Sequence, residues 1–210
     1  MKYRLREIFS TVQGEGRNTG LPATFIRFAG CNLSCPWCDT RRHAKEILSV
    51  AEIMAAVRSF GNRAVVVTGG EPTMVVGLGD VLSKLKSEGY WLALETNGLK
   101  SIPEIEMFDY VAVSPKYFYR TKYVSESILT KADEVRIVAE STGMEDFCRK
   151  MRERISAADY YVSPLDENGK MHYRRAFNLM QRLNASASVK TAPWPPWAIS
   201  IQTHKVLGLR

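Results

Sequence analysis

Short apolar runs rich in β-branched and aromatic residues recur along the chain and predict buried strands. They fall at residues 24–28, 64–67, 91–94, 110–113, 134–138, 160–162 and 198–201. Between several of these runs, apolar residues return every three to four positions, which is typical of an amphipathic helix. These helical patterns cover residues 49–60, 80–88, 144–155 and 172–183. Two of the predicted helices begin with the sequence of a capping box, Ser49 with Glu52 and Thr142 with Glu145.

The alternation of strands and helices predicts an α/β fold with a mainly parallel sheet, either open or curled toward a barrel. We expect a partial or modified (β/α) barrel with about six mainly parallel strands. Only about fifteen residues, including Pro103, separate the third and fourth predicted strands, which leaves little room for a helical crossover. The fold should therefore have fewer helices than strands. Residues 1–210 are expected to form a single domain, with a proline-rich surface excursion at 185–196.

Polar and glycine-rich segments follow the predicted strands at the points where each strand ends. Because parallel α/β sheets gather their ligands at the carboxyl ends of the strands, these segments should share one mouth. Each of them alone would also suit an ordinary turn. The segments are Gly30 with the cysteine-containing loop, 68–72, 95–98, 114–116, 163–166 and 202–205.

The composition is that of an ordinary globular chain, with 210 residues, 45% hydrophobic and 24% charged residues and a net charge of +7. No run of about 18 apolar residues occurs, and the first residues lack the apolar stretch of a signal peptide. We therefore expect a cytoplasmic protein with no membrane partner. The positive charge leaves anionic partners open, and the aromatic and basic run at 117–120 would suit nucleic acid. The other cations are scattered, so we expect no nucleic-acid partner.

Three of the four cysteines, Cys31, Cys35 and Cys38, lie within eight residues, whereas Cys148 stands alone. Three soft thiolates on one short loop suit a metal rather than a disulfide framework. A zinc site with His43 as the fourth ligand is one possibility. The other is a cubane iron–sulfur cluster, in which three cysteines would leave one iron open to a small molecule. Cys148 lies beside apolar residues of a predicted helix, which favours a buried thiol over a fourth ligand.

The cysteine motif Cys-x3-Cys-x2-Cys, with Trp37 before its last cysteine, resembles the signature of radical S-adenosylmethionine (SAM) enzymes. In that superfamily the open iron chelates the methionine end of SAM. The Gly-Gly-Glu sequence at 69–71 resembles the second motif of the superfamily, which meets the methionine ammonium. A longer ordered set of motifs resembles the 7-carboxy-7-deazaguanine synthase family, at 12–16, 25–28, 38–40, 68–72, 95–98, 114–116 and 202–205.

The resemblance implies a radical SAM lyase of queuosine and related 7-deazapurine biosynthesis. Such an enzyme converts 6-carboxy-5,6,7,8-tetrahydropterin to 7-carboxy-7-deazaguanine with loss of ammonia. A 4Fe-4S cluster on Cys31, Cys35 and Cys38 would pass one electron to SAM and release a 5′-deoxyadenosyl radical. The residues implied around SAM are Trp37, Gly70, Glu71, Ser114, Pro115, Lys116, Ser163 and Asp166.

Arg27 is expected to bind the pterin carboxylate, because its planar fork donates hydrogen bonds to two carboxylate oxygens. An arginine among the apolar residues of a strand needs an anionic partner or a wet cavity, which supports this role. An internal ion pair to Glu15 or Glu95 is the alternative. The other implied substrate-binding residues are Val12, Gln13, Gly14, Thr68 and Asn97, and Glu95 and His204 are expected to handle protons.

The resemblance also implies Mg2+ on Thr40, next to Asp39, with substrate oxygens completing the coordination shell. It further implies an electron donor such as flavodoxin or ferredoxin, and a homodimer. Two features depart from the family pattern. Ser163 stands where the family usually has glutamine, a loss of reach for which Asp166 would compensate. The chain ends in Arg210, so we do not expect the family's contact between C-terminus and substrate.

Two other classes of function fit parts of the sequence. A radical activase that abstracts hydrogen from a glycine of a partner protein would share the cysteine motif. It would leave Arg27 and residues 202–205 without an evident role. A non-enzymatic zinc or nucleic-acid-binding module would account for the cysteines or for the aromatic run, but not for the ordered set of motifs. Metal content and product identity distinguish the three.

Overall fold

A computed structural model describes residues 1–38, 43–186 and 188–209. Its strands are β1 (Lys2–Val12), β2 (Pro22–Phe28), β3 (Glu46–Ser49), β4 (Ala64–Gly69), β5 (Trp91–Thr96), β6 (Tyr110–Val113), β7 (Glu134–Ala139), β8 (Asp159–Pro164), β9 (Asp166–Glu167), β10 (Lys170–Met171) and β11 (Trp197–Ile199). Its α-helices are α1 (Val50–Phe60), α2 (Leu78–Ser87), α3 (Arg120–Ser125), α4 (Glu145–Arg154), α5 (Tyr173–Asn184) and α6 (Thr203–Val206). The 3₁₀ helices are η1 (Pro72–Met74), η2 (Pro103–Met107), η3 (Tyr117–Tyr119) and η4 (Val189–Thr191).

Nine of the strands in the described residues form one sheet, in the order β11-β8-β7-β6-β5-β4-β2-β1-β3. The strands from β11 to β2 in this order pair in parallel, whereas β1 pairs antiparallel with β2 and β3. All the predicted strands lie in the parallel part, which confirms the α/β class and the mainly parallel sheet. The strand β1 was not predicted, because its apolar residues alternate with charged ones instead of forming a continuous run. The short β3 and the β9–β10 hairpin were also missed.

The longer helices begin close to their predicted starts. The capping box of α1 is confirmed, since the Ser49 hydroxyl accepts from the Glu52 amide at 3.3 Å and the Ser49 amide donates to the Glu52 carboxylate at 2.7 Å. The prediction of a capping box formed by Thr142 and Glu145 is wrong. Gly143, with φ +71°, turns the chain before α4, so that Met144 occupies the N-cap position and makes no side-chain cap. The helices α3 and α6 were not predicted, because each is too short to show a helical period.

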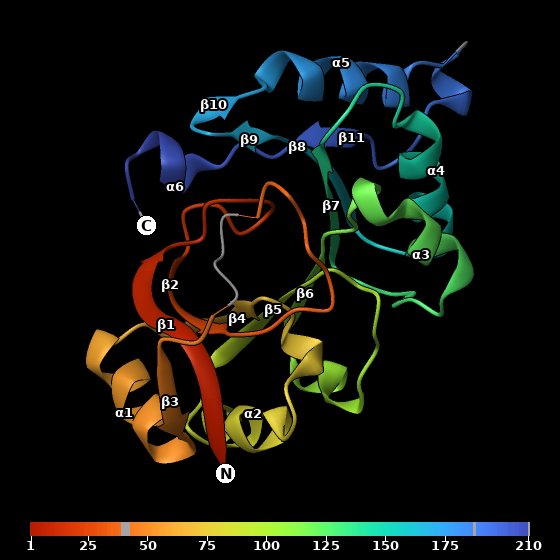
Figure 1. Cartoon of the computed structure of the whole chain (residues 1–210). Helices are drawn as coiled ribbons and strands as arrows, with labels where there is room; N and C mark the ends of the chain where they lie inside the picture. Colours follow the sequence, from red (N-terminus) through yellow and green to blue (C-terminus); the bar gives the residue numbers. More distant parts are fainter. Residues whose placement is uncertain (39–42, 187, 210) are drawn as a thin grey trace.

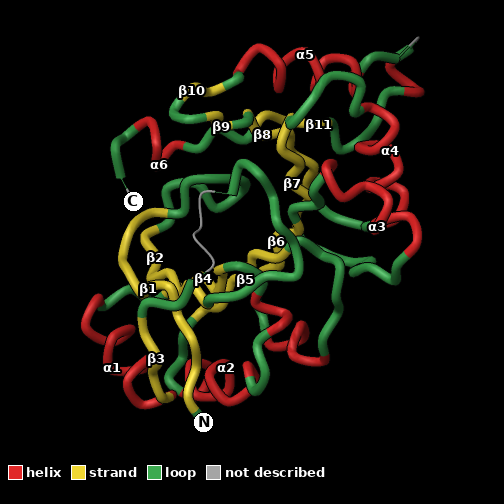
Figure 2. Tube along the Cα trace, in the orientation of Figure 1, coloured by secondary structure: helices red, strands yellow, loops and turns green. Residues whose placement is uncertain are grey.

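The sheet is strongly curved. Figure 1 shows it passing from β1 and β2 through β4, β5 and β6 to β7, and then to β8 and β11. The long helices lie outside this curve, with α1 and α2 near one end and α4 and α5 near the other (Figure 2). Between β5 and β6 the chain forms only η2, as the short connection predicted. Within the described residues no pairing joins the end strands β3 and β11, so the sheet is open there.

Side-chain alternation divides the sheet into an outer and an inner face. Outward-facing residues such as Ile26, Val65 and Leu92 pack in one core with residues of α1 and α2. Their neighbours Phe25 and Val66 belong to a different cluster on the inner face. Because the period of a strand is two residues, the polar residues that follow on the inner face also point into the curve. The sheet thus collects polar side chains on its inner face, among them Arg27, Thr68, Glu95 and Arg136.

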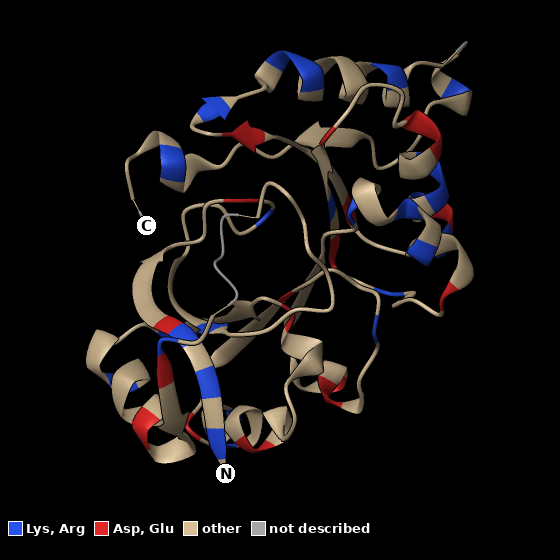
Figure 3. Cartoon of the chain, in the orientation of Figure 1, with Lys and Arg blue, Asp and Glu red and all other residues tan. Residues whose placement is uncertain are grey.

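Lysine and arginine residues are spread over the molecule and interspersed with acidic ones (Figure 3). They occur on β1 near the N-terminus, on α4 and α5, and on α6. None of the helices in the described residues combines the length and the apolar character needed to cross a membrane.

Candidate active site

The inner face of the sheet opens into a cavity of about 270 Å³. Its walls come from the β1–β2 connection, the cysteine loop, the ends of the parallel strands and the C-terminal segment. The predicted site residues that line it are Val12, Gln13, Gly14, Arg27, Cys31, Cys35, Trp37, Cys38, Thr68, Gly70, Glu71, Glu95, Asn97, Ser114, Lys116, Asp166 and His204. The expectation that strand-end segments share one mouth is therefore confirmed.

The cysteine loop is held by hydrogen bonds to the end of β5 and to η3. The Asn97 side chain, at the end of β5, donates to Asn32 Oδ1 at 2.7 Å. On the other side the Ser34 amide donates to the hydroxyl of Tyr119 at 2.7 Å. The Leu33 amide donates to Cys31 Sγ at 3.3 Å, as backbone amides do around metal-bound sulfur. These contacts hold the loop that carries the three cysteines over the mouth of the sheet.

Two glycines bring the end of β4 against the same loop. A side chain at Gly69, where φ is +145°, would overlap the backbone of Phe28. One at Gly70 would overlap the Gly30 carbonyl and approach Cys31 Cβ to 3.0 Å. The absence of side chains lets the Glu71 amide donate to the Gly30 carbonyl at 2.8 Å. The Gly-Gly sequence is therefore a packing requirement of the cysteine loop.

The donor set fits an iron–sulfur cluster better than a zinc site. Cys31, Cys35 and Cys38 line one cavity, whereas His43 is exposed and is not among the residues that line it. Cys148 is fully buried on α4, and burial raises its pKa to about 12, so it is a core thiol as expected. As they are placed in this structure, no three or more histidine, cysteine, aspartate or glutamate side chains of the described residues lie where they could hold a metal ion together. Burial, opposed by nearby Lys116, raises the pKa of Cys35 to about 11.

Glu71 ties the glycine turn to the end of β5. Its Oε1 accepts from the Thr73 amide at 3.1 Å and from the hydroxyls of Thr73 and Thr96 at 2.8 and 2.7 Å. Its Oε2 accepts from the Asn97 amide at 2.8 Å. Although only 1% of Glu71 is exposed, the residue lines the cavity. A carboxylate oxygen can accept more than one hydrogen bond, so Oε2 retains acceptor capacity toward a ligand.

The aromatic run at 117–120 supports the cysteine loop. The ring of Phe118 packs edge-on against Trp37 at 5.9 Å between centroids. Tyr119 binds the loop through its hydroxyl, and Tyr117 packs edge-on against Phe147 of α4. Arg120 lies over the Tyr117 ring at 4.8 Å. Most of these rings therefore pack against other parts of the protein. The aromatic run at 117–120 supports the cysteine loop, a structural role that does not require nucleic acid.

Ser114 and Lys116 follow β6 at the cavity wall. The Lys116 ammonium donates to the Ser114 hydroxyl at 2.7 Å. Pro115 is buried between them and is not among the lining residues. Glu140, at the end of β7, accepts from the amides of Tyr117 and Phe118 at 3.1 and 2.7 Å, and burial raises its pKa to about 7.

Arg27 lines the cavity, and among the described residues it forms an internal ion pair with Glu7 instead of with Glu15 or Glu95, the partners of the alternative interpretation. Its Nε lies 3.1 Å from Glu7 Oε1, and its guanidinium lies over the Phe9 ring at 5.5 Å. Glu7 and Phe9 belong to β1, the strand that pairs antiparallel with β2. Because β1 was not predicted as a strand, the sequence could not bring Glu7 beside Arg27.

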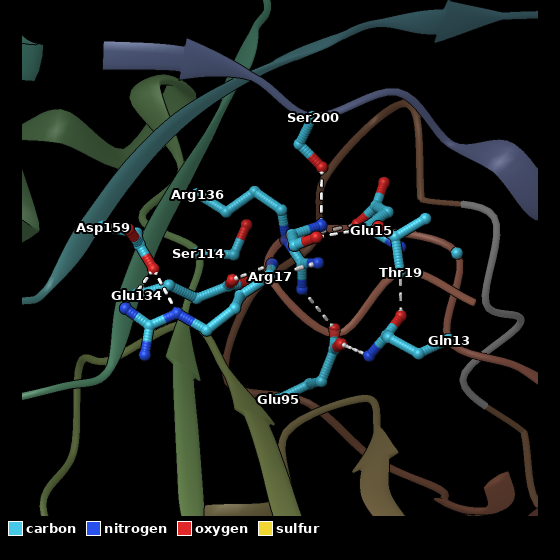
Figure 4. Close-up of polar contacts among 12 residues, drawn as sticks. Gln13, Glu15, Arg17, Thr19, Glu95, Ser114, Glu134, Arg136, Asp159 and Ser200 are labelled. Carbon is cyan, nitrogen blue, oxygen red and sulfur yellow. Dashed lines mark hydrogen bonds and ion pairs between the residues drawn. The ribbon is translucent and has the colours of Figure 1, made fainter. Parts of the chain in front are cut away.

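Glu15 and Glu95 instead pair with an arginine that was not predicted (Figure 4). Arg136 lies on β7 with 2% of its surface exposed. It contacts Glu15 at 3.2 Å, Glu95 at 2.8 Å and Glu134 at 3.3 Å. The signal that could have identified it is the one that singled out Arg27, an arginine inside an apolar strand.

The β1–β2 connection and the C-terminal segment meet at the cavity. The side-chain amide of Gln13 donates through Nε2 to Glu95 Oε1 at 2.7 Å. The Gly14 carbonyl accepts from the Thr203 amide and hydroxyl at 2.9 and 3.0 Å. His204, the next residue, packs against Gly14 and lines the cavity. Residues from opposite ends of the sequence therefore form one wall.

Of Ser163, which stands in place of the family's glutamine, and Asp166, which was expected to compensate, only Asp166 lines the cavity. Ser163 is 1% exposed, is not among the lining residues, and its hydroxyl has no hydrogen-bond partner in the described residues. Asp166 lines the cavity and binds the Lys205 ammonium at 2.7 Å. Asp39 and Thr40, the predicted magnesium region, and Arg210 lie outside the described residues.

Comparisons with known proteins agree with this geometry. The sequence profile of the radical SAM superfamily matches residues 25–120. The chain is 44% identical over 207 residues to 7-carboxy-7-deazaguanine synthase of Haemophilus influenzae, which covers 99% of this chain and 94% of the relative. It is 42% identical over 208 residues to the synthase of the same name from Neisseria meningitidis, with 99% and 94% covered.

The fold resembles the crystal structure of QueE from Escherichia coli, with a TM-score of 0.71 over 96% of this chain and 94% of that chain, at 24% identity. That likeness supports the curved α/β architecture. The match to each of the two synthases extends over 99% of this chain. The chain therefore belongs to the 7-carboxy-7-deazaguanine synthase family of the radical SAM superfamily.

Proposed function

We propose that this chain is itself a 7-carboxy-7-deazaguanine synthase. It converts 6-carboxy-5,6,7,8-tetrahydropterin to 7-carboxy-7-deazaguanine with loss of ammonia, as a lyase of queuosine or related 7-deazapurine biosynthesis. The observation that carries the proposal is one cavity lined both by Cys31, Cys35 and Cys38 and by charged and amide side chains of the strand ends. A loop that suits a cluster thus borders a polar space for a second small molecule.

A bound 4Fe-4S cluster would supply one electron to SAM, and the cleavage of SAM would release a 5′-deoxyadenosyl radical. In our proposal the three cysteines hold the cluster. Glu71 accepts a hydrogen bond from the methionine ammonium of SAM through its remaining acceptor capacity. The other proposed SAM-binding residues are Trp37, Gly70, Ser114, Pro115, Lys116, Ser163 and Asp166.

Arg27 binds the pterin carboxylate in this proposal, because it is a cation at the cavity wall whose position is maintained by Glu7. Glu95 and His204 hold and transfer protons during the ring contraction. The pKa of Glu95 is lowered, because Arg136, Gln13 and Lys116 together outweigh the raising effect of burial, which is the largest single contribution. The ring edge is bound by Val12, Gln13, Gly14, Thr68 and Asn97.

The resemblance to the family carries the remaining parts of the proposal. Mg2+ binds Thr40 and substrate oxygens, because a hard cation prefers oxygen ligands. The electron donor is a flavodoxin or ferredoxin, the chain forms a homodimer, and it works in the cytoplasm. Turnover with and without Mg2+ after chelation, and the mass of the protein in solution, test the metal and the dimer directly.

The function is tested by anaerobic reconstitution with iron and sulfide, followed by SAM, reductant, Mg2+ and the carboxypterin. The expected result is 7-carboxy-7-deazaguanine, together with iron and sulfide in a cubane ratio. Formation of 5′-deoxyadenosine without the deazapurine would mean that the substrate is another one. A glycyl radical signal on an added partner protein would support an activase, and one tightly bound zinc without iron would exclude radical chemistry.

A further inference from the structure

We propose that Arg136 is a positioning residue for the ring contraction, holding Glu15 and Glu95 in the orientation that meets the substrate. The inference rests on the proposed function and assigns to Arg136 a task that the cysteine and glycine motifs do not imply. Figure 4 shows Arg136 between Glu15 and Glu95, at the centre of the polar contacts of the site.

One guanidinium connects three elements of the fold. Its Nε lies 3.2 Å from Glu15 in the β1–β2 connection, and one terminal nitrogen lies 2.8 Å from Glu95 on β5. The other terminal nitrogen lies 3.3 Å from Glu134, which is on the same strand, β7. A planar fork with fixed N–H directions sets the positions of its partners more strictly than an ammonium does. Arg136 thus bridges the β1–β2 connection and β5, two elements that Gln13 also joins through its hydrogen bond to Glu95.

The three carboxylates have different surroundings. Glu134 is 1% exposed and also accepts from the Tyr110 hydroxyl at 2.8 Å and from the Arg17 amide at 3.0 Å. It is not among the residues that line the cavity, whereas Glu15, Glu95 and Arg136 are. Glu134 therefore anchors Arg136 to the wall. Glu15 and Glu95 are the carboxylates that Arg136 presents to a ligand.

The charge of Arg136 also matters for the ionisation of Glu95. Burial raises the pKa of that carboxyl, and Arg136 is the strongest of the groups that lower it. The other charged or titratable groups around the cluster are Lys116, Glu15, Glu134, Arg17, Tyr110, Asp159 and Tyr161. Without Arg136, two neighbouring carboxylates would remain beside Glu95, and only Gln13 and Lys116 would oppose the effect of burial on its pKa. Glu95 would then stay protonated up to a higher pH.

The test compares Arg136→Met, which removes the charge, with Arg136→Lys, which keeps the charge but not the fork. Arg17→Met is the matched control, because Arg17 pairs with Asp159 at 2.5 Å outside the cavity lining. Each protein is purified anaerobically, checked for cluster content and melting temperature, and assayed for both 5′-deoxyadenosine and deazapurine over a range of pH.

For Arg136→Met we expect deazapurine formation to fall about 100-fold, since small misplacements of catalytic groups cost this much. SAM cleavage should continue, so 5′-deoxyadenosine accumulates without product, and the acid limb of the pH profile of kcat should move to higher pH. Arg136→Lys should restore the acid limb but not the full kcat. Arg17→Met should behave as the wild type.

Several results would overturn the inference. One is a folded, cluster-containing Arg136→Met protein with wild-type kcat and an unmoved acid limb. Another is an equal loss in Arg17→Met. If Arg136→Met does not fold, wild-type kcat and KM in Arg136→Lys would exclude a role for the fork. A wild type that makes no deazapurine would overturn the proposed function and this inference together, whereas a productive wild type beside an unaffected Arg136→Met would overturn the inference alone.

Discussion

The backbone of Gly14 lies directly against the imidazole of His204, so that a Cβ at position 14 would overlap Nδ1 of that ring. The same glycine carbonyl accepts two hydrogen bonds from Thr203. The first turn after β1 and the C-terminal helix are therefore in contact through one residue that has no side chain.

Gly14→Ala should displace His204 and weaken substrate binding. We expect the KM for the carboxypterin to rise between roughly 10- and 100-fold, while cluster content stays normal. Steady-state kinetics in the His204→Ala background provides the control. Because the overlap is with the ring, Gly14→Ala should add little to the loss already caused by His204→Ala. Fully additive losses would show that Gly14 acts through another contact.

Gly70→Ala should prevent the cysteine loop from closing on the end of β4. The added methyl group meets the Gly30 carbonyl and the Cys31 side chain, so we expect a large loss of iron and of the brown absorption after reconstitution. Gly79→Ala in α2 is the matched control, since its nearest neighbour would be Glu104 Oε1 at an ordinary 3.4 Å. That variant should keep its iron and gain up to about 1 kcal/mol in stability. Normal iron in Gly70→Ala would contradict the packing argument.

Cys35→Ala and Cys148→Ala should have opposite effects. Loss of Cys35 should abolish the cluster absorption and all deazapurine formation with little change in thermal stability. Loss of the buried Cys148 should cost about 1 kcal/mol of unfolding free energy while leaving the cluster intact. Iron analysis and thermal melts of both variants measure the two effects. A complete cluster in Cys35→Ala would implicate Cys148 as a ligand.

The contact between Asp166 and Lys205 should make docking of the C-terminal segment sensitive to acid. The hydrogen bond from Lys205 lowers the pKa of Asp166, so its stabilising contribution is present above the usual carboxyl pKa and is lost as pH falls through the lowered value. Protection factors of amides 203–209 should fall below about pH 4. Asp166→Asn should reduce them already at neutral pH, by no more than about 1 kcal/mol.

Glu167→Gln is the control for that experiment. Glu167 is the next carboxylate on the same hairpin, and it pairs with His172 at 3.0 Å instead of with the C-terminal segment. Its replacement should leave the protection of amides 203–209 unchanged. An unchanged acid response in Asp166→Asn would show that another group controls the docking.

The sequence alone predicted the parallel strands, because strands covered on both faces appear as continuous apolar runs. It also predicted the contents of the cavity to a large extent. Strands that run parallel end at one edge, so the residues after each run, such as Glu71, Asn97 and Ser114, had to lie near one another. The spacing of Cys31, Cys35 and Cys38 indicated a metal site in the same local way, since one loop carries all three, and the resemblance to the radical SAM motif favoured an iron–sulfur cluster over zinc.

Only the tertiary structure decided which charges meet. Arg27 and Arg136 both lie inside apolar strands, and the sequence indicates merely that each needs a partner or a wet cavity. Their partners come from β1, β5 and the β1–β2 connection, and the strand order and register that bring these elements together are not encoded in local periodicity. Ion pairing depends on distances across the sheet, whereas local sequence patterns report on neighbours along the chain. For that reason the sequence indicated a metal site on the cysteine loop, and only the fold showed which carboxylates surround Arg136.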